Sequence, residues 1–332
     1  MQATRGVRAR AARKPPDLRA AAAPAPEAAL PAGRVLRLAR RGRIVYREVA
    51  GPPGAPVLLL LHGWIASAGL NWRRAFAPLG RHFRVIAPDL RGHARGIRSL
   101  RPFRLEDCAD DAAALLAALG CESAIAVGYS MGGPVAQLLW QRHPARVSGL
   151  VLCATSHRPV RGSRARRGAF RSALVAAALA ARVPRLGALA QRPLKRLALS
   201  RIDRSASAPS IGHALLELLL HDPRMLLEAG AALGRYGADA WIGGIDVPTA
   251  VVVTTRDRAI RPEDQVQQAL RIRGAKVFCV DSGHRASDDP RFTQALLQAC
   301  GDVAARAAQA RPPALRARAR RELLARIEAL LA

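Results

Sequence analysis

A serine flanked by glycines is the first feature of the chain that suggests chemistry. The segment VGYSMGGPVAQLL, residues 127–139, places Ser130 between Gly128 and Gly132, directly after an apolar run typical of a strand. Glycine inside a strand or helix costs about 0.5–1 kcal/mol relative to alanine, so this cluster indicates a sharp turn without room for side chains. A residue held at such a turn is strained, and its side chain points into the open. The spacing favours a nucleophilic serine, although a tight turn alone would have the same pattern.

A serine hydroxyl becomes a good nucleophile when a base takes its proton and a third group orients the base. In open parallel sheets, the residues that act on a ligand follow the carboxyl ends of the strands. Asp257 ends the apolar segment VVVTTRD, and His284 follows the segment VFCVDSG. The order Ser130, Asp257, His284 along the chain is the one that accompanies a G-x-S-x-G turn. We therefore predict a Ser–His–Asp triad.

Other titratable residues near the predicted strand ends have a structural interpretation. Asp246 precedes its strand and is expected at the opposite pole of the sheet. The end of the preceding strand, CATSHRP, offers no carboxylate, which favours Asp257 as the acid. We expect His62 and His93 to form hydrogen bonds with the loop backbone around the turn that supplies the oxyanion-stabilising N–H groups described next. We expect Asp89 to organise a loop.

Acyl transfer also needs two N–H groups that stabilise the negatively charged oxygen of the intermediate. We expect one from Met131, the residue after the serine, because N–H groups at a helix N-terminus lack an intrahelical partner. The other is expected from Trp64, in the loop after the segment LLLLHG. This chemistry needs no metal and no organic cofactor.

The composition is that of a globular protein. Half of the 332 residues are hydrophobic, and this length allows one large domain or two. The five cysteines are scattered and form no C-x-x-C pair, which argues against a disulfide framework or a zinc site and fits a reducing compartment. No apolar region follows the basic start, and no apolar run reaches the ~18 residues of a membrane span. We expect a cytoplasmic protein.

The net charge of +29 is unusual for such a chain. A field of this sign attracts nucleic acid, anionic lipid or an acidic substrate. The basic residues are almost all arginine beside an excess of alanine, which equally fits a compositional bias of the whole chain. Aromatic residues make up 4%, and no nucleic-acid module is recognisable, so we do not expect specific nucleic-acid binding.

Strand and helix patterns alternate along most of the chain. We expect strands within residues 34–40, 42–50, 55–63, 83–92, 123–130, 147–155, 247–257 and 275–284, and helices within 105–120, 132–144, 262–272 and 291–309. The continuous apolar runs are typical of strands buried on both faces. This alternation predicts an α/β fold with a mostly parallel, doubly wound sheet.

Residues 157–244 interrupt the alternation. They show helical patches at 168–183, 214–222 and 224–233 but no clear strand, and 157–210 carry 13 basic residues against one acidic residue, Asp203. We therefore expect a helical cap at 157–244, inserted between two parts of the core at 34–156 and 245–310. Residues 1–33 are expected to form a disordered basic tail, and 311–332 a basic amphipathic helix.

Several motifs together resemble those of α/β-hydrolase-fold proteins. They are LHGW (61–64), PDLRGHARG (88–96), GYSMGG (128–133), TTRDRAIRP (254–262) and DSGHRAS (281–287), and the likeness runs from about residue 34 to 309. The second motif departs slightly, with Ala94 and Gly96 where relatives usually have Gly and Ser. The resemblance implies Ser130 as nucleophile, Asp257 as acid and His284 as base. It also implies that Met131 and Trp64 supply the oxyanion donors.

The residue at the turn separates groups within this family. Epoxide hydrolases and haloalkane dehalogenases of this fold place aspartate there, whereas serine implies attack at a carbonyl. We expect hydrolysis of a carboxylic ester on a small acyl substrate. The alternatives are a carbon–carbon hydrolase or lyase, and a cofactor-free haloperoxidase.

A further alternative comes from outside enzymology. The basic cap, tails and C-terminal helix would suit a protein that binds anionic surfaces, with a hydrolase-like core. Leucines on one face of the 315–332 segment and arginines around them fit peripheral contact with an anionic membrane. The same leucines would equally suit packing against the protein's own core.

Overall fold

The computed structural model describes residues 30–181 and 219–309. Most of the expected basic tail, the middle of the expected cap and the expected helix at 311–332 lie outside the described residues. The helix expected at 214–222 falls there too, except for its last four residues. In the described parts, no helix is long and apolar enough to cross a membrane.

Eight strands form one sheet, as the alternating pattern predicts. In spatial order they are β1 (Gly33–Leu38), β2 (Gly42–Val49), β4 (Arg84–Pro88), β3 (Val57–Leu61), β5 (Ala124–Tyr129), β6 (Val147–Cys153), β7 (Thr249–Thr254) and β8 (Lys276–Val280). The β1–β2 and β2–β4 pairs are antiparallel, and all other pairs are parallel. Every residue of β5 and β7 is buried, which explains their unbroken apolar sequences.

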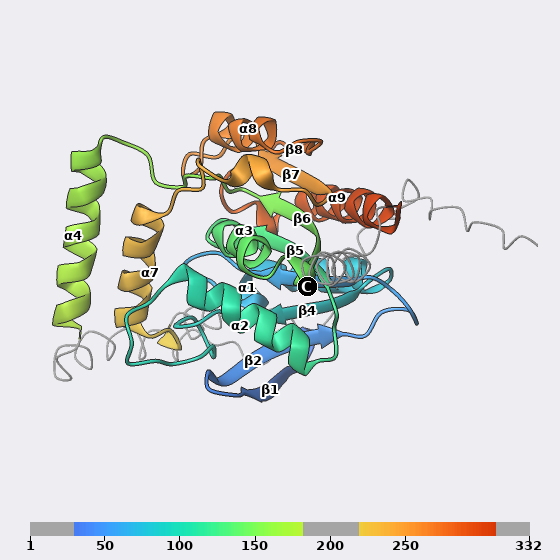
Figure 1. Ribbon diagram of the computed structural model, residues 1–332, viewed down its shortest axis with the longest axis horizontal. Coiled ribbons are helices and arrows are strands. Elements are labelled where there is room, and N and C mark those ends of the chain that lie inside the picture. The colour runs from blue at the N-terminus through green and yellow to red at the C-terminus, as the bar shows by residue number, and fades with distance from the viewer. Residues whose placement is uncertain (1–29, 182–218, 310–332) are drawn as a thin grey trace, which may run out of the picture.

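Helices cover both faces of the sheet (Figure 1). On one face, α1 (Ala68–Gly80) and α9 (Pro290–Gln309) pack around Trp72, Phe76 and Phe292. On the other face lie α2 (Leu105–Ala118), α3 (Gly132–Arg142) and α8 (Pro262–Arg271). Short 3-10 turns occupy Pro144–Arg146, Ile242–Gly244 and Ala286–Asp288. This is the doubly wound α/β arrangement that was expected.

Helix α1 is an element that the sequence patterns did not predict. Ser67 begins it by accepting a hydrogen bond from the N–H of Leu70. Its apolar stripe is interrupted by polar residues, and Pro78 lies inside its last turn. Burial of Trp72 and Phe76 against α9 and the sheet compensates for this weak local signal.

The described ends of the inserted segment are helical. Helices α4 (Arg164–Ala180) and α7 (Pro223–Arg235) lie side by side, apart from the sheet at the left of Figure 1. Helix α7 is fastened to the loops at the carboxyl ends of the strands. There the Trp64 indole donates to the Leu226 carbonyl at 2.9 Å, and the Asp222 N–H donates to the Gly92 carbonyl at 2.9 Å.

The contact between β3 and the start of α3 leaves no space for a side chain. A Cβ built on Gly132 would lie 2.0 Å from the Leu61 carbonyl oxygen, and one on Gly128 would lie 2.3 Å from the Gly132 carbonyl oxygen. Backbone atoms cannot be displaced as the end of a flexible side chain can. The glycine cluster noted in the sequence therefore allows the close approach of two backbone segments.

This contact predicts a strong effect of a single methyl group. Gly132→Ala should lower the free energy of unfolding by about 1–3 kcal/mol or more, because the core must shift to admit it. The matched control is Gly168→Ala in α4, where an added Cβ meets nothing within 4 Å and alanine favours the helix. Urea unfolding measures both. Equal stabilities of the two variants would contradict the assigned contact.

Candidate active site

Ser130 lies at the sharp turn between β5 and α3. Its φ is 50°, in the left-handed region that residues with a Cβ seldom adopt. The backbone around it is held firmly. The Ser130 N–H donates to the Cys153 carbonyl at 3.0 Å, and the Ser130 carbonyl accepts from Gly133 N–H at 2.9 Å and from the Thr155 hydroxyl at 2.8 Å. These contacts with β6 and α3 offset the strain at the serine.

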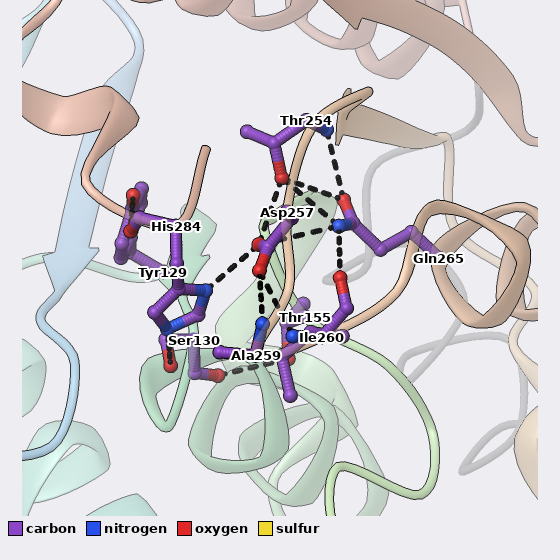
Figure 2. Close-up of polar contacts among 9 residues, drawn as sticks. All are labelled: Tyr129, Ser130, Thr155, Thr254, Asp257, Ala259, Ile260, Gln265 and His284. Carbon is purple, nitrogen blue, oxygen red and sulfur yellow. Dashed lines mark hydrogen bonds and ion pairs between the residues drawn. The ribbon is translucent and has the colours of Figure 1, made fainter. Parts of the chain in front are cut away.

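The structure brings together the three side chains predicted to form a triad (Figure 2). The Oγ of Ser130 lies 3.0 Å from Nε2 of His284, and Nδ1 of His284 lies 2.7 Å from Oδ2 of Asp257. An ionised carboxylate only accepts hydrogen bonds, so the imidazole proton belongs on Nδ1. The lone pair of Nε2 then faces the serine hydroxyl, which is the geometry a general base requires.

Asp257 is buried and fully hydrogen-bonded. Its Oδ1 accepts from the N–H groups of Ala259 and Ile260 at 2.8 and 2.9 Å, and its Oδ2 also accepts from the Thr254 hydroxyl at 2.9 Å. Burial alone would raise the pKa of Asp257. The hydrogen bond and charge of His284, together with the donors from Ile260 and Thr254, bring the pKa below the ordinary aspartate value. The group is therefore a carboxylate at neutral pH.

Gln265, which supports the surroundings of Asp257, was not recognised in the sequence. The Gln265 amide, from α8, donates to the Thr254 hydroxyl at 2.9 Å and to the Ile260 carbonyl at 2.7 Å. Its oxygen accepts from the Thr254 N–H at 3.1 Å. Gln265 is entirely buried. A glutamine on the apolar face of a predicted helix is the signal that could have revealed it, since buried amides need partners.

Tyr129 holds the backbone of the histidine. Its hydroxyl donates to the His284 carbonyl at 2.6 Å, and burial raises the pKa of Tyr129. The phenol thus keeps the proton that it donates. This contact was not anticipated, because it joins residues that are 155 positions apart.

The predicted oxyanion donors flank the serine. Met131 directly follows Ser130 and caps the N-terminus of α3. Trp64 lines the same cavity as Ser130, and the preceding Gly63 is so near that an added Cβ would lie 3.3 Å from the serine Cβ. Asn71 fixes this loop by accepting from the Gly63 N–H at 2.7 Å. That the backbone N–H groups of Met131 and Trp64 act on an oxyanion stays a prediction.

The histidines expected to be structural bond loop backbone. His62 Nε2 accepts from the Leu90 N–H at 2.8 Å, its Nδ1 lies 2.8 Å from the Gly63 carbonyl, and burial lowers its pKa to about 4. His93 Nδ1 lies 2.9 Å from the Arg91 carbonyl. Both side chains are buried away from the serine's cavity.

Asp89 and Asp246 have the positions and contacts that the sequence indicates. Asp89 accepts from the N–H groups of Ala68 at 2.9 Å and Arg95 at 3.2 Å, and so organises the loops after β3 and β4. Asp246 lies before β7, at the opposite end of that strand from Asp257, and accepts from the Trp140 indole at 3.2 Å.

A cavity of about 830 Å³ opens onto Ser130 and His284. Apolar side chains from the β3–α1 loop, α1 and the segment before α7 form part of its wall, namely Trp64, Ile65, Leu70 and Leu220. Among residues 30–181 and 219–309, no group of His, Cys, Asp and Glu side chains is arranged to hold a metal ion. The volume is that of a site for a small organic molecule.

Residues 56–289 match the model of the α/β hydrolase fold family. The chain belongs to this family. It is an α/β-hydrolase enzyme, as the sequence motifs and the eight-stranded sheet indicated.

Relatives within the family differ in their activities. The chain is 34% identical to pimeloyl-[acyl-carrier protein] methyl ester esterase of Chromobacterium violaceum over 208 residues, which is 62% of this chain and 78% of that protein. It is also 34% identical to epoxide hydrolase B of Mycobacterium tuberculosis over 116 residues, which is 33% of this chain and only 32% of that protein. These partial matches give the family but not the substrate.

Solved structures agree on the fold. A thermophilic esterase from Thermogutta terrifontis is 26% identical, with a TM-score of 0.61, over 80% of this chain and 97% of that chain. A hydrolase from Pseudomonas aeruginosa PA01 is 24% identical, with a TM-score of 0.63, over 80% and 97% of the respective chains.

The hydrogen bonds of the buried Gln265 amide predict an effect on stability. Gln265→Leu should lower the free energy of unfolding by about 1–3 kcal/mol, because the Thr254 N–H and the Ile260 carbonyl would lose buried partners. Gln267→Leu is the matched control on the same helix, since Gln267 is exposed and should change stability by less than ~0.5 kcal/mol. Chemical denaturation of both variants provides the comparison. An unaffected Gln265→Leu protein would show that these hydrogen bonds contribute little.

Proposed function

We propose that this protein is a serine hydrolase that cleaves a carboxylic ester or a related acyl bond. The proposal depends chiefly on one observation. Ser130 Oγ lies 3.0 Å from His284 Nε2, while His284 Nδ1 lies 2.7 Å from the buried Asp257 carboxylate. This is the arrangement of nucleophile, base and orienting acid that acyl transfer requires.

Each side chain then has a defined step. Ser130 attacks the acyl carbon as His284 removes its proton, and the Met131 and Trp64 N–H groups stabilise the oxyanion. The intermediate collapses, and His284 returns the proton to the leaving alcohol. Water, activated by His284, attacks the acyl-enzyme and releases the acid. Asp257 stabilises the imidazolium that forms in both halves.

The chemistry of the nucleophile favours acyl substrates over epoxides. An aspartate that opens an epoxide forms an alkyl ester, which water can hydrolyse to regenerate the enzyme. A serine that opened an epoxide would form an ether, which water does not cleave under such conditions. When Ser130 bonds to an acyl carbon, it forms an ester that water can hydrolyse. The resemblance to an epoxide hydrolase therefore gives no support for that activity here.

The other enzymatic alternatives use the same three side chains. A carbon–carbon hydrolase also attacks a carbonyl, and a haloperoxidase passes through an acyl-enzyme whose acceptor is peroxide. Ester hydrolysis is preferred because it needs only the nucleophile, the base, the oxyanion donors and water. A non-catalytic protein that binds anionic surfaces would not require the hydrogen-bond network that surrounds Asp257.

Covalent labelling tests the nucleophile. A fluorophosphonate probe should label the wild-type protein, and Ser130→Ala should abolish the labelling. Hydrolysis of p-nitrophenyl esters should fall by roughly 10³–10⁶-fold in Ser130→Ala and His284→Ala. Ser148→Ala is the control, because Ser148 lies near the start of β6, at the opposite end of the sheet. Equal labelling of Ser130→Ala and wild type would reject the assignment and favour the non-catalytic alternative.

A pair of isosteric variants tests the acid. Asp257→Asn should retain the fold but lower kcat by roughly 10³–10⁴-fold, since an amide does not stabilise the imidazolium. Asp246→Asn, at the other end of β7, should leave kcat nearly unchanged because the amide oxygen still accepts from Trp140. Steady-state kinetics with circular dichroism as a check on folding would decide. A larger loss of kcat in Asp246→Asn than in Asp257→Asn would show that the assignment of Asp257 as the acid is wrong.

A further inference from the structure

The cavity at the catalytic serine is strongly basic. Five arginines line it together with Ser130 and His284, namely Arg47, Arg73, Arg74, Arg95 and Arg285. Among the described residues of this lining, Asp288 is the only carboxylate. The site of a neutral ester is usually apolar with a few polar groups, so this lining calls for a specific explanation.

These arginines come from separate parts of the chain. Arg47 lies on β2, Arg73 and Arg74 on α1, Arg95 in the loop between β4 and α2, and Arg285 beside His284. A charge run in the sequence would place arginines on one segment. Here four segments bring cations to one cavity, and the fold determines this convergence.

Two carboxylates, Asp288 and Asp89, lie near three of these arginines. Asp288 lies 3.4 Å from Arg285, in an exposed pair, and such pairs are weak. Asp89 lies behind the wall, where its oxygens accept the N–H groups of Ala68 and Arg95. Burial raises the pKa of Asp89, and the charges of Arg47 and Arg95 oppose that rise. By formal charge, the described residues of the lining therefore comprise five guanidinium groups and one carboxylate.

The lining is apolar as well as basic. Trp64, Ile65, Leu70 and Leu220 contribute hydrocarbon surface, against which a short alkyl chain could pack. Guanidinium groups bind carboxylate and phosphate through paired N–H···O bonds. A molecule with an ester, an apolar spacer and a terminal anion matches the serine with its histidine, the hydrocarbon surface and the arginines.

We propose that the substrate is an ester that carries an anionic group, a carboxylate or a phosphate, separated from the ester by an apolar chain. This inference rests on the proposed esterase function. The ester carbonyl lies at Ser130, and the anion is bound by the arginines that line the cavity. Because the chain is rich in arginine throughout, the test must separate these arginines from the general charge.

The main experiment compares esters that differ only in the terminal charge. Mono-p-nitrophenyl esters of dicarboxylic acids are measured beside p-nitrophenyl alkanoates of the same carbon number. The diacids are chosen long enough that the carboxylate does not attack its own ester. We expect kcat/KM for the anionic ester to exceed that for the neutral ester by about tenfold at low salt, and the ratio to fall as salt rises.

Two matched double variants locate the effect. Arg74→Gln with Arg95→Gln removes two cavity cations, both on exposed residues, and should lower the anionic-to-neutral ratio by about tenfold. Arg37→Gln with Arg273→Gln removes the same charge from exposed positions outside the cavity lining. This control should change the ratio less than about twofold. Melting temperatures confirm that both proteins are folded.

Competition experiments identify the anion. A monoalkyl phosphate, an alkanoate and an alkanol of equal chain length are tested as inhibitors of neutral-ester hydrolysis. Inhibition by either anion that weakens in the cavity variant supports the inference, and the stronger of the two anions gives the chemical class. Inhibition by the alkanol as strong as that by the anions would overturn it.

The outcomes separate this inference from the proposed function. If the wild type prefers neutral esters, or if the control pair lowers the ratio as much as the cavity pair, the inference is wrong. The esterase proposal would then stand as long as turnover depends on Ser130. If no ester is hydrolysed and no probe reacts, the esterase proposal fails. Calorimetric binding of the same alkyl anions to the wild type and the cavity variant still tests the basic site.

Discussion

The geometry at the serine depends on one steric condition, the contact between the backbones of β3 and α3. The Leu61 carbonyl occupies the space that a side chain at Gly132 would need, and the Gly132 carbonyl does the same at Gly128. With these contacts the chain turns sharply at Ser130, whose φ is 50°. Such a conformation costs about 1–3 kcal/mol. The packed sheet supplies that energy and aims the hydroxyl at the cavity.

The strand order then determines which residues can reach the serine. Strands β5, β6, β7 and β8 are consecutive parallel neighbours, so their carboxyl ends lie along one edge of the sheet. Asp257 and His284 follow β7 and β8 at that edge. The inserted segment leaves the sheet after β6 and returns before β7. Its sequence can therefore change the cavity wall without moving the strand ends that hold the triad.

Local sequence patterns were sufficient to predict the strands and to select Ser130, Asp257 and His284, which the structure brings within hydrogen-bonding distance of one another, because each is marked within a few residues of its own position. They were insufficient for α1, whose helical stripe is broken and whose stability comes from burying Trp72 and Phe76 against distant elements. They also missed Gln265 and Tyr129. The roles of these side chains depend on the path of the loop at 255–260 and on the position of the His284 backbone, which only the assembled fold determines.

The surroundings of Asp257 matter in a protein so rich in arginine. Apart from His284, its oxygens accept from two backbone N–H groups, the Thr254 hydroxyl and, at 3.5 Å, the Gln265 amide, all of which are neutral donors. A guanidinium in their place would already neutralise the carboxylate and would weaken its electrostatic stabilisation of the imidazolium. Neutral donors keep the negative charge available to His284, on which an imidazolium forms in the proposed mechanism. In the proposed mechanism, these neutral donors leave Asp257 able to stabilise the imidazolium although arginines line the cavity.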